Sequence, residues 1–204
     1  ELPGGAVAKG LTIRLDEGDQ TASVCYDTAT MEMRAAWTGG FLQFDPARYG
    51  IIVSPRPQGE PIFVAEPGPA WDEHEVKYRG HYRHGERIFL SYTVDGVRVL
   101  ESPSLIESGE GGHAAVVRTF EIAPHDEPLS VRIPESAAIQ VHASGADVDG
   151  TSAVIPPSES LQRVYVLIAP SELIPQNAEA MLATAMEALR NPLIPGSPPI
   201  WGQT

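Results

Sequence analysis

The stretch that decides the fold is YRGHYRHGERIFLSYTVDGVRVLE, residues 78–101. Its middle part, residues 87–94 (RIFLSYTV), is rich in β-branched and aromatic side chains, and residues 97–100 resume the apolar alternation after Asp95-Gly96. An Asp-Gly pair between two such runs predicts a β-hairpin, because both residues accept the positive φ of a tight two-residue turn. One face of the first strand is expected to point into a core; its residues are Ile88, Leu90, Tyr92 and Val94.

The same rhythm of short strands and turns continues on both sides of this hairpin. Strands are predicted over residues 6–15, 21–27, 28–37, 41–44, 51–53, 62–64, 113–122, 129–133, 137–142 and 161–169. The proline-rich stretch 46–69 is expected to wrap as loops with short edge strands. Residues 69–77 and 103–112 are interpreted as polar connectors, and residues 143–157 as a turn with one weak strand. The pattern predicts an all-β fold, a twisted antiparallel β-sandwich.

The end of the chain changes character. Residues 177–190 predict a helix that starts at Asn177 and stops before Pro192. Its apolar stripe is expected to pack on the domain's own sheet, and it consists of Met181, Leu182, Ala185, Met186 and Leu189. The predicted organisation is a β-sandwich domain over residues 1–170, a helical segment over 171–190, and a proline-rich linker or docking tail over 191–204. In that tail Ile200 and Trp201 are predicted to anchor a partner.

Composition excludes several classes of partner. The net charge of −13 over 204 residues argues against binding to nucleic acid or to an anionic membrane surface. No apolar run has transmembrane length, so direct membrane insertion is not expected. A single cysteine, Cys25, rules out an intrachain disulfide and is interpreted as a buried, inert thiol. Because the chain opens at Glu1 rather than Met, we expect it to derive from a longer precursor.

The sequence carries no strong signature of a catalytic centre. His81 and His84 lie three residues apart, but an extended segment sends them to opposite faces, so no metal site is predicted there. The metalloprotease, zinc, nucleophile-elbow, phosphate-loop and CxxCH haem motifs do not occur. We therefore expect no cofactor in this chain, and leave open whether an acidic loop binds calcium.

Aromatic residues provide the better candidates for a ligand site. Trp71 and Tyr82 stand in polar surroundings and are predicted to be exposed, whereas Trp37 is predicted to lie in the core. Together with Arg83 and His84, they form the predicted ligand-binding set.

Three segments carry a resemblance to a known family. They are AKGLTIRLDEG (residues 8–18), CYDTATMEMRAAWTGGFLQF (25–44) and YRGHYRHGERIFLSYTVDGVRVLES (78–102). In this order they resemble an uncharacterised domain of large exported proteins of the planctomycete and verrucomicrobium type. There the domain precedes a β-propeller that resembles sugar dehydrogenases, and often a c-type cytochrome domain. The motif GSPPIW, residues 196–201, resembles the junction that leads into the propeller.

The resemblance implies a cellular location and neighbouring domains or partners, but it assigns no catalytic residues. It implies an exported protein, periplasmic or on the cell surface, next to a c-type cytochrome or β-propeller, with haem c only in such an associated domain or partner. We expect a non-catalytic β-sandwich module that mediates docking between domains or subunits of a redox or surface assembly. The alternative is a carbohydrate-binding or carbohydrate-active sandwich domain, in which Tyr82, Arg83, His84 and an acidic residue line a groove.

Overall fold

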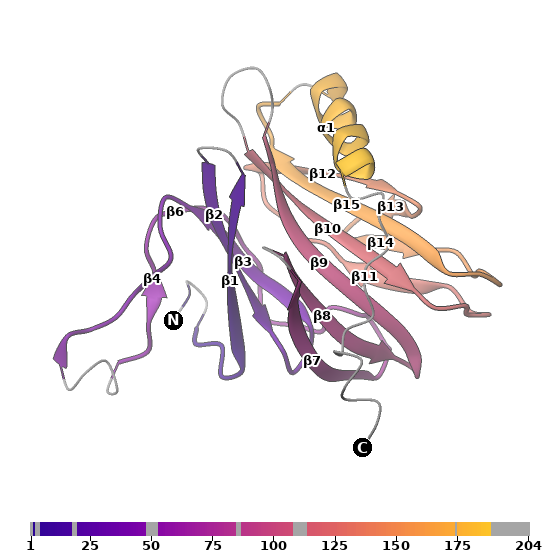
Figure 1. Ribbon diagram of the computed structural model, residues 1–204, viewed down its shortest axis with the longest axis horizontal. Helices are drawn as coiled ribbons and strands as arrows, with labels where there is room; N and C mark the ends of the chain where they lie inside the picture. The colour runs from indigo at the N-terminus through magenta and orange to yellow at the C-terminus, as the bar shows by residue number, and fades with distance from the viewer. Residues whose placement is uncertain are drawn as a thin grey trace.

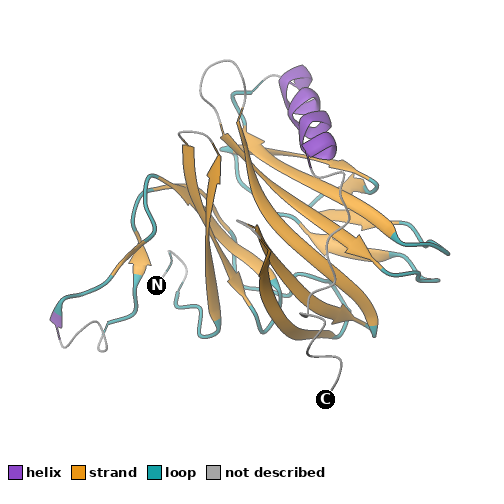
Figure 2. Ribbon diagram, in the orientation of Figure 1, coloured by secondary structure: helices purple, strands orange, loops and turns teal. Residues whose placement is uncertain are grey.

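The computed structural model describes residues 2, 5–17, 20–47, 53–84, 87–107, 114–173 and 175–188. These residues form antiparallel sheets of six, four and three strands, a two-stranded ribbon and the helix α1 (Figures 1 and 2). The predicted all-β, sandwich-like architecture is confirmed. The described helix does not have the length and apolar character needed to span a membrane.

The six-stranded sheet has the order β12-β15-β10-β9-β8-β7. Its strands are β7 (Val76–His84), β8 (Arg87–Val94), β9 (Val97–Glu107), β10 (Ala114–Ile122), β12 (Ile139–Ser144) and β15 (Gln162–Pro170). Four neighbours in this order are consecutive in sequence, from β7 to β10, so this half of the sheet is a simple meander.

The four-stranded sheet has the order β1-β2-β3-β6, and the three-stranded sheet the order β11-β14-β13. Their strands are β1 (Gly10–Glu17), β2 (Gln20–Asp27), β3 (Glu32–Thr38), β6 (Glu60–Val64), β11 (Leu129–Arg132), β13 (Asp147–Asp149) and β14 (Ser152–Ile155). A separate ribbon pairs β4 (Leu42–Gln43) with β5 (Arg56–Pro57).

The predicted hairpin at Asp95-Gly96 joins β8 to β9 in the six-stranded sheet. Asp95 has φ 47° and Gly96 has φ 84°, so both turn residues have the positive φ of a type I′ turn. Leu90, Tyr92 and Val94 are fully buried in the main core and Ile88 packs against it, which confirms the predicted inner face. The hairpin was therefore correctly assigned in position, turn and facing.

One large core lies between the sheets. It contains buried side chains from the six-stranded, four-stranded and three-stranded sheets, including Ile13, Val24, Leu90, Phe120 and Ile155. A smaller cluster on the outer face of the four-stranded sheet holds Cys25 and Trp37 beside Leu2. Both the burial of Trp37 and that of the Cys25 thiol are thus confirmed.

Helix α1 (Pro175–Ala188) packs on the opposite face of the six-stranded sheet, as Figure 1 shows. Packing on the domain's own sheet is confirmed, because Met181, Leu182 and Ala185 are buried against β10 and β15. The predicted start at Asn177 was wrong: the helix begins at Pro175, whose fixed φ and missing N–H suit a first turn. Met186 is 39% exposed rather than part of the buried stripe.

Several predicted boundaries also need correction. Residues 103–112 are not simply a connector, because β9 continues through Pro103 to Glu107 and pairs with β10. Pro103 is tolerated because the pairing of β8 with β9 ends at Glu101. Beyond that residue β9 pairs only with β10, so it behaves as an edge strand there. The first strand begins at Gly10 rather than residue 6, and the weak strand of residues 143–157 is in fact two strands, β13 and β14. The predictions for Ile51, Ile52 and His113 lie outside the described residues.

Candidate binding surfaces

Strand β7, at the edge of the six-stranded sheet, carries most of the predicted ligand-binding residues. Its register with β8 shifts between Tyr78 and Gly80, where Gly80 has φ 139°. Because the bulge inserts an extra residue, Tyr78 and His81 come to the same face although they are three apart. The Tyr78 hydroxyl lies 2.6 Å from His81 Nδ1, and the two rings are stacked.

The residues after the bulge alternate between the two faces of the sheet. His81 and Arg83 stand opposite Leu90 and Ile88, on the side of the main core, whereas Tyr82 and His84 stand opposite Phe89 and Arg87. The Tyr82 ring stacks on Phe89 with ring centroids 5.1 Å apart. The structure therefore does not bring Tyr82, Arg83 and His84 to one surface: Arg83 faces one side with His81, and the other two face away.

Trp71 is not a surface residue, and the prediction of its exposure was wrong. It is fully buried, with its ring centroid 5.9 Å from that of Phe120 and 6.1 Å from that of Tyr92. Its backbone forms an isolated bridge with Val131, which draws the connector before β7 into the core between the sheets. Trp71 is followed in sequence by the polar residues Asp72 and Glu73, and this is why the local sequence suggested exposure.

A polar groove runs between β1 and the inner side of β7. It has a volume of about 420 Å³ and is lined from β1 by Leu11, Thr12, Ile13, Arg14 and Asp16, and from β7 and β8 by His81, Arg83 and Ile88. Arg14 and Asp16 form an exposed ion pair, with Nε 3.0 Å from Oδ1. Of the predicted ligand-binding set, only Arg83 lines this groove. Arg14, Asp16 and His81 were missed; for Arg14 and Asp16 the available signal was their alternation with the apolar Ile13 and Leu15.

A second, apolar hollow lies on the outer face of the four-stranded sheet. Its volume is about 390 Å³, and Ala35, Trp37, Val64, Pro57 and Pro61 contribute to its lining. Arg56 and Pro57 belong to β5, so the ribbon β4–β5 forms one wall. This ribbon projects from the body of the molecule at the left of Figure 1, and we call residues 41–47 and 53–57 the arm. Phe44 on the arm is 58% exposed, and Phe41 is 36% exposed.

The interior holds a buried ionic network that was not predicted. Arg118 on β10 places Nε 2.7 Å from Glu101 Oε1 on β9, and both side chains are buried. The hydroxyls of Tyr26 and Tyr92 donate to the same carboxylate at 2.7 and 2.8 Å. Burial, followed by the negative charge of Glu101, raises the pKa of both tyrosines well above the ordinary value. Burial alone would lower the pKa of Arg118, but the charge of Glu101 raises it, so Arg118 stays a cation.

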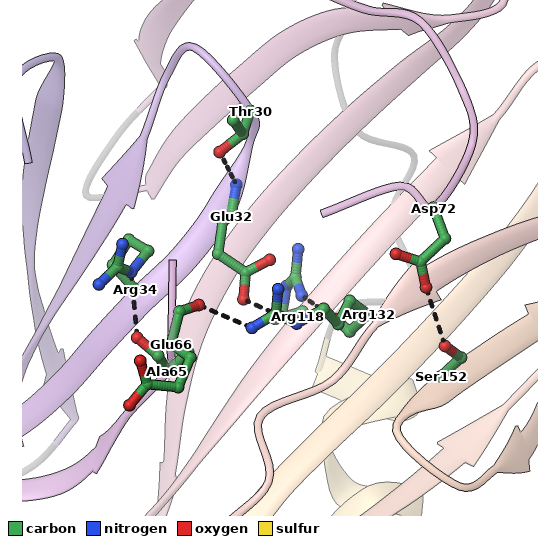
Figure 3. Close-up of polar contacts among 9 residues, drawn as sticks. All are labelled: Thr30, Glu32, Arg34, Ala65, Glu66, Asp72, Arg118, Arg132 and Ser152. Carbon is green, nitrogen blue, oxygen red and sulfur yellow. Dashed lines mark hydrogen bonds and ion pairs between the residues drawn. The ribbon is translucent and has the colours of Figure 1, made fainter. Parts of the chain in front are cut away.

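A second carboxylate, Glu32 on β3, lies near this network. Figure 3 shows its side chain directed toward Arg118 and Arg132, with Oε1 3.9 Å from Arg132 Nε. Its Oε2 is buried without a hydrogen-bond partner in the structure. Burial raises the pKa of Glu32 to about 7, against the lowering effect of three nearby arginines. A carboxyl group that titrates near neutrality is a candidate pH-sensitive element of the fold.

The arginines around Glu32 hold the segment that crosses from one sheet to the other. Arg34 Nε donates to the Ala65 carbonyl at 3.1 Å, and Arg132 Nη2 donates to the Glu66 carbonyl at 2.6 Å (Figure 3). The Asp72 carboxylate accepts a 3.4 Å hydrogen bond from Ser152. These contacts are structural, since each fixes backbone or a neighbouring strand.

The comparisons with known proteins add one match. Residues 24–101 match a domain of unknown function, DUF6797. The DUF6797 match runs from β2 into β9 and so includes strands of both main sheets, while β10, β12 and β15 lie outside it. The presence of an uncharacterised domain here is confirmed. No curated protein and no solved structure matches the chain.

The remaining predicted positions are outside what can be described. Ile200 and Trp201, predicted to dock a partner, lie beyond the described residues. Within the described ranges, no group of three or more His, Cys, Asp or Glu side chains is placed to hold a metal ion.

Proposed function

We propose that this chain is a non-catalytic β-sandwich module that docks a neighbouring domain or subunit of an exported redox or surface assembly. The observation that supports it is the arm, which exposes Phe44 and which, through Arg56 and Pro57, forms one wall of an apolar hollow. In a protein with a net charge of −13, an arm that carries an exposed aromatic residue and also walls an apolar hollow is the kind of surface that is buried on association. The resemblance of residues 8–102 makes a β-propeller or a c-type cytochrome the expected neighbour.

The arm suits docking for a physical reason. Its two strands are only two residues each, so little of its exposed apolar surface can be covered by its own ribbon. Aromatic side chains supply large contact areas at a low cost in conformational entropy, and this favours Phe44 as an anchor. The carbohydrate hypothesis remains a prediction, but it loses Trp71 as a stacking surface because that ring is buried.

A photo-crosslinking experiment tests the docking proposal. Phe44 is replaced by p-benzoylphenylalanine in the chain expressed within its native cells, and cross-linked partners are identified by mass spectrometry. The matched control carries the same substitution at Leu161, which is 54% exposed and lies far from the arm in sequence. We expect cross-links from position 44 to one defined domain or subunit, and none of these from position 161.

A second measurement uses the haem signal of the expected partner. Phe44→Ser should reduce co-purified haem c several-fold, because a polar side chain removes the apolar anchor, while Leu161→Ser should leave it unchanged. Equal haem recovery from both variants, together with no specific cross-link from position 44, would refute docking through the arm.

A further inference from the structure

The two larger sheets end in four edge strands, and three of them are protected against further pairing. Strand β7 has a bulge at Gly80, and β6 contains Pro61 and has a register shift in its pairing with β3. Strand β12 has six residues, two fewer than β1. Bulges, prolines and short length are the ordinary ways in which proteins prevent another strand from adding to an edge.

Strand β1 differs from these three. It has eight residues, contains no proline, and pairs with β2 in one unbroken register from Gly10 to Glu17. In the described part of the chain its other side pairs with no strand. Part of this edge lies close to β9, and the stretch from Leu11 to Arg14 borders the polar groove. A long regular edge of this kind presents a row of backbone donors and acceptors to an incoming strand.

The polar groove supplies the space beside this edge. The consecutive residues Leu11, Thr12, Ile13 and Arg14 all line it. Successive residues of a strand point to opposite faces, so a hollow that touches four in a row runs along the edge of the strand rather than over one face. The volume of about 420 Å³ is in the range of sites that hold a ligand.

The opposite wall of the groove is basic. His81 and Arg83 stand there without a carboxylate, whereas the wall formed by β1 holds the Arg14–Asp16 ion pair, so the groove lining has more arginine than carboxylate side chains. This is a local reversal of sign in a protein with a net charge of −13. The guanidinium group of Arg83, with its planar set of N–H donors, can donate hydrogen bonds to a carboxylate.

We infer that β1 and the groove beside it bind an extended acidic segment of a partner protein, which adds to the four-stranded sheet as a fifth strand. The backbone edge of β1 provides the ladder of hydrogen bonds, and the wall formed by His81, Arg83 and Ile88 selects side chains. A carboxylate of the segment faces His81 and Arg83, and an apolar side chain two residues away faces Ile88. This surface lies on a different strand from the arm and does not depend on the arm being a docking site.

Two other occupants fit the groove less well. A second copy of the chain would bring another net charge of −13 to the contact, which opposes association. A saccharide would leave the backbone edge of β1 beside the groove, from Leu11 to Arg14, without the ladder that an added strand can form. Both remain as outcomes that the experiment distinguishes.

The experiment measures binding of a fluorescent octapeptide by anisotropy, using the full chain. The probe alternates valine and glutamate and has blocked termini; a matched peptide alternates valine and lysine. A third peptide keeps the valine-glutamate sequence but carries N-methyl groups on alternate amides, which removes backbone donors along one edge. We expect the glutamate peptide to bind, and both the lysine peptide and the N-methylated peptide to bind about tenfold more weakly or worse.

Variants then locate the site. Arg83→Glu should weaken binding of the glutamate peptide about tenfold or more, because an attraction becomes a repulsion. Lys77→Glu makes the same charge change on the outer face of β7 and should change the affinity by less than about twofold. The comparison of the three peptides needs only the wild-type chain, so it holds even if Arg83→Glu fails to fold.

Several results would overturn the inference. Equal binding of the glutamate and lysine peptides would show that the site does not select by charge. Equal binding of the glutamate peptide and its N-methylated form would show that no backbone ladder forms. Concentration-dependent dimerisation that is abolished by Arg83→Glu would assign the edge to a second copy. Displacement of the peptide by a neutral oligosaccharide would assign the groove to a saccharide.

Discussion

Arg118 Nε lies 2.7 Å from Glu101 Oε1, and the two side chains form an ion pair that is sealed from solvent between the sheets. The guanidinium group also lies over the Phe120 ring, 4.9 Å from its centroid, and donates to the Arg132 carbonyl through Nη1. The hydroxyls of Tyr26 on β2 and Tyr92 on β8 donate to the Glu101 carboxylate. The charged pair therefore connects strands of both main sheets. Such a pair is costly to desolvate, so its partners depend on each other.

Arg118→Met should therefore destabilise the fold strongly. The substitution leaves the Glu101 carboxylate buried without its cationic partner, and we expect a loss of about 3–5 kcal/mol in the free energy of unfolding. Urea unfolding followed by tryptophan fluorescence measures it. Arg14→Met is the matched control, because the Arg14–Asp16 pair is more than half exposed on both sides, and its loss should stay within about 0.5 kcal/mol. Similar losses in both variants would show that Glu101 does not depend on Arg118.

Leu90→Ala tests the packing of the central hairpin. Leu90 is fully buried in the main core, so truncation should cost roughly 2–5 kcal/mol through lost contacts and the cavity left behind. Leu161→Ala removes the same atoms from a side chain that is 54% exposed and should cost less than about 0.5 kcal/mol. Chemical denaturation of both variants gives the comparison, and a Leu90→Ala loss as small as the control would contradict the core assignment.

Glu32 predicts a pH dependence of stability. Burial raises the pKa of its carboxyl from 4.5 to about 7, so the folded state holds the proton more tightly than the unfolded state. Stability contributed by the protonated form is present below pH 4.5 and falls as pH rises from there to about 7, by up to about 3 kcal/mol. Urea unfolding at a series of pH values from 4.5 to 8 would show it.

The Glu32→Gln variant isolates this effect from those of other groups that bind protons over the same pH range. Glutamine keeps the shape and a hydrogen-bonding group but does not ionise, so the difference in stability between wild type and variant should change with pH over the window of Glu32. The stability of the variant relative to that of the wild type should increase as pH rises. A difference that is constant across the window would mean that Glu32 keeps the same protonation in both states.

The predicted docking tail, residues 191–204, lies outside the described residues and is tested by deletion. Proline-rich segments restrict their own unfolded state and can lie extended on a surface at low entropic cost, and Trp201 would be the anchor. Removal of residues 192–204 should abolish co-purification of a partner and leave the melting temperature unchanged. A lowered melting temperature with intact partner binding would instead place the tail on its own domain.

The sequence was informative wherever one face of a strand was apolar and turn chemistry marked the ends. The alternation in residues 87–94 and the Asp95-Gly96 dipeptide fixed a hairpin, because only one register buries Leu90, Tyr92 and Val94 together. The helix was recognised by its 3.6-residue period, although its start was placed two residues late.

The polar interior could not be predicted in the same way. Arg118 occupies an inner position of β10 between Val116 and Phe120, but its partner Glu101 is on another strand, and Tyr26 precedes Glu101 by 75 residues in sequence. Strand pairing has to be known before such groups can be matched. Trp71 was misplaced for a related reason, since its polar neighbours indicated solvent while a bridge to Val131 held it inside.

The position of the Glu101–Arg118 pair has a consequence for the order of folding during synthesis. The DUF6797 match ends at residue 101, so a chain that has emerged from the ribosome only this far contains the carboxylate and both tyrosines but not the arginine. Packing the two main sheets together at that stage would bury an anion without its cation. The two main sheets therefore pack together only after β10 has been synthesised, and the cooperative folding unit is larger than the matched domain.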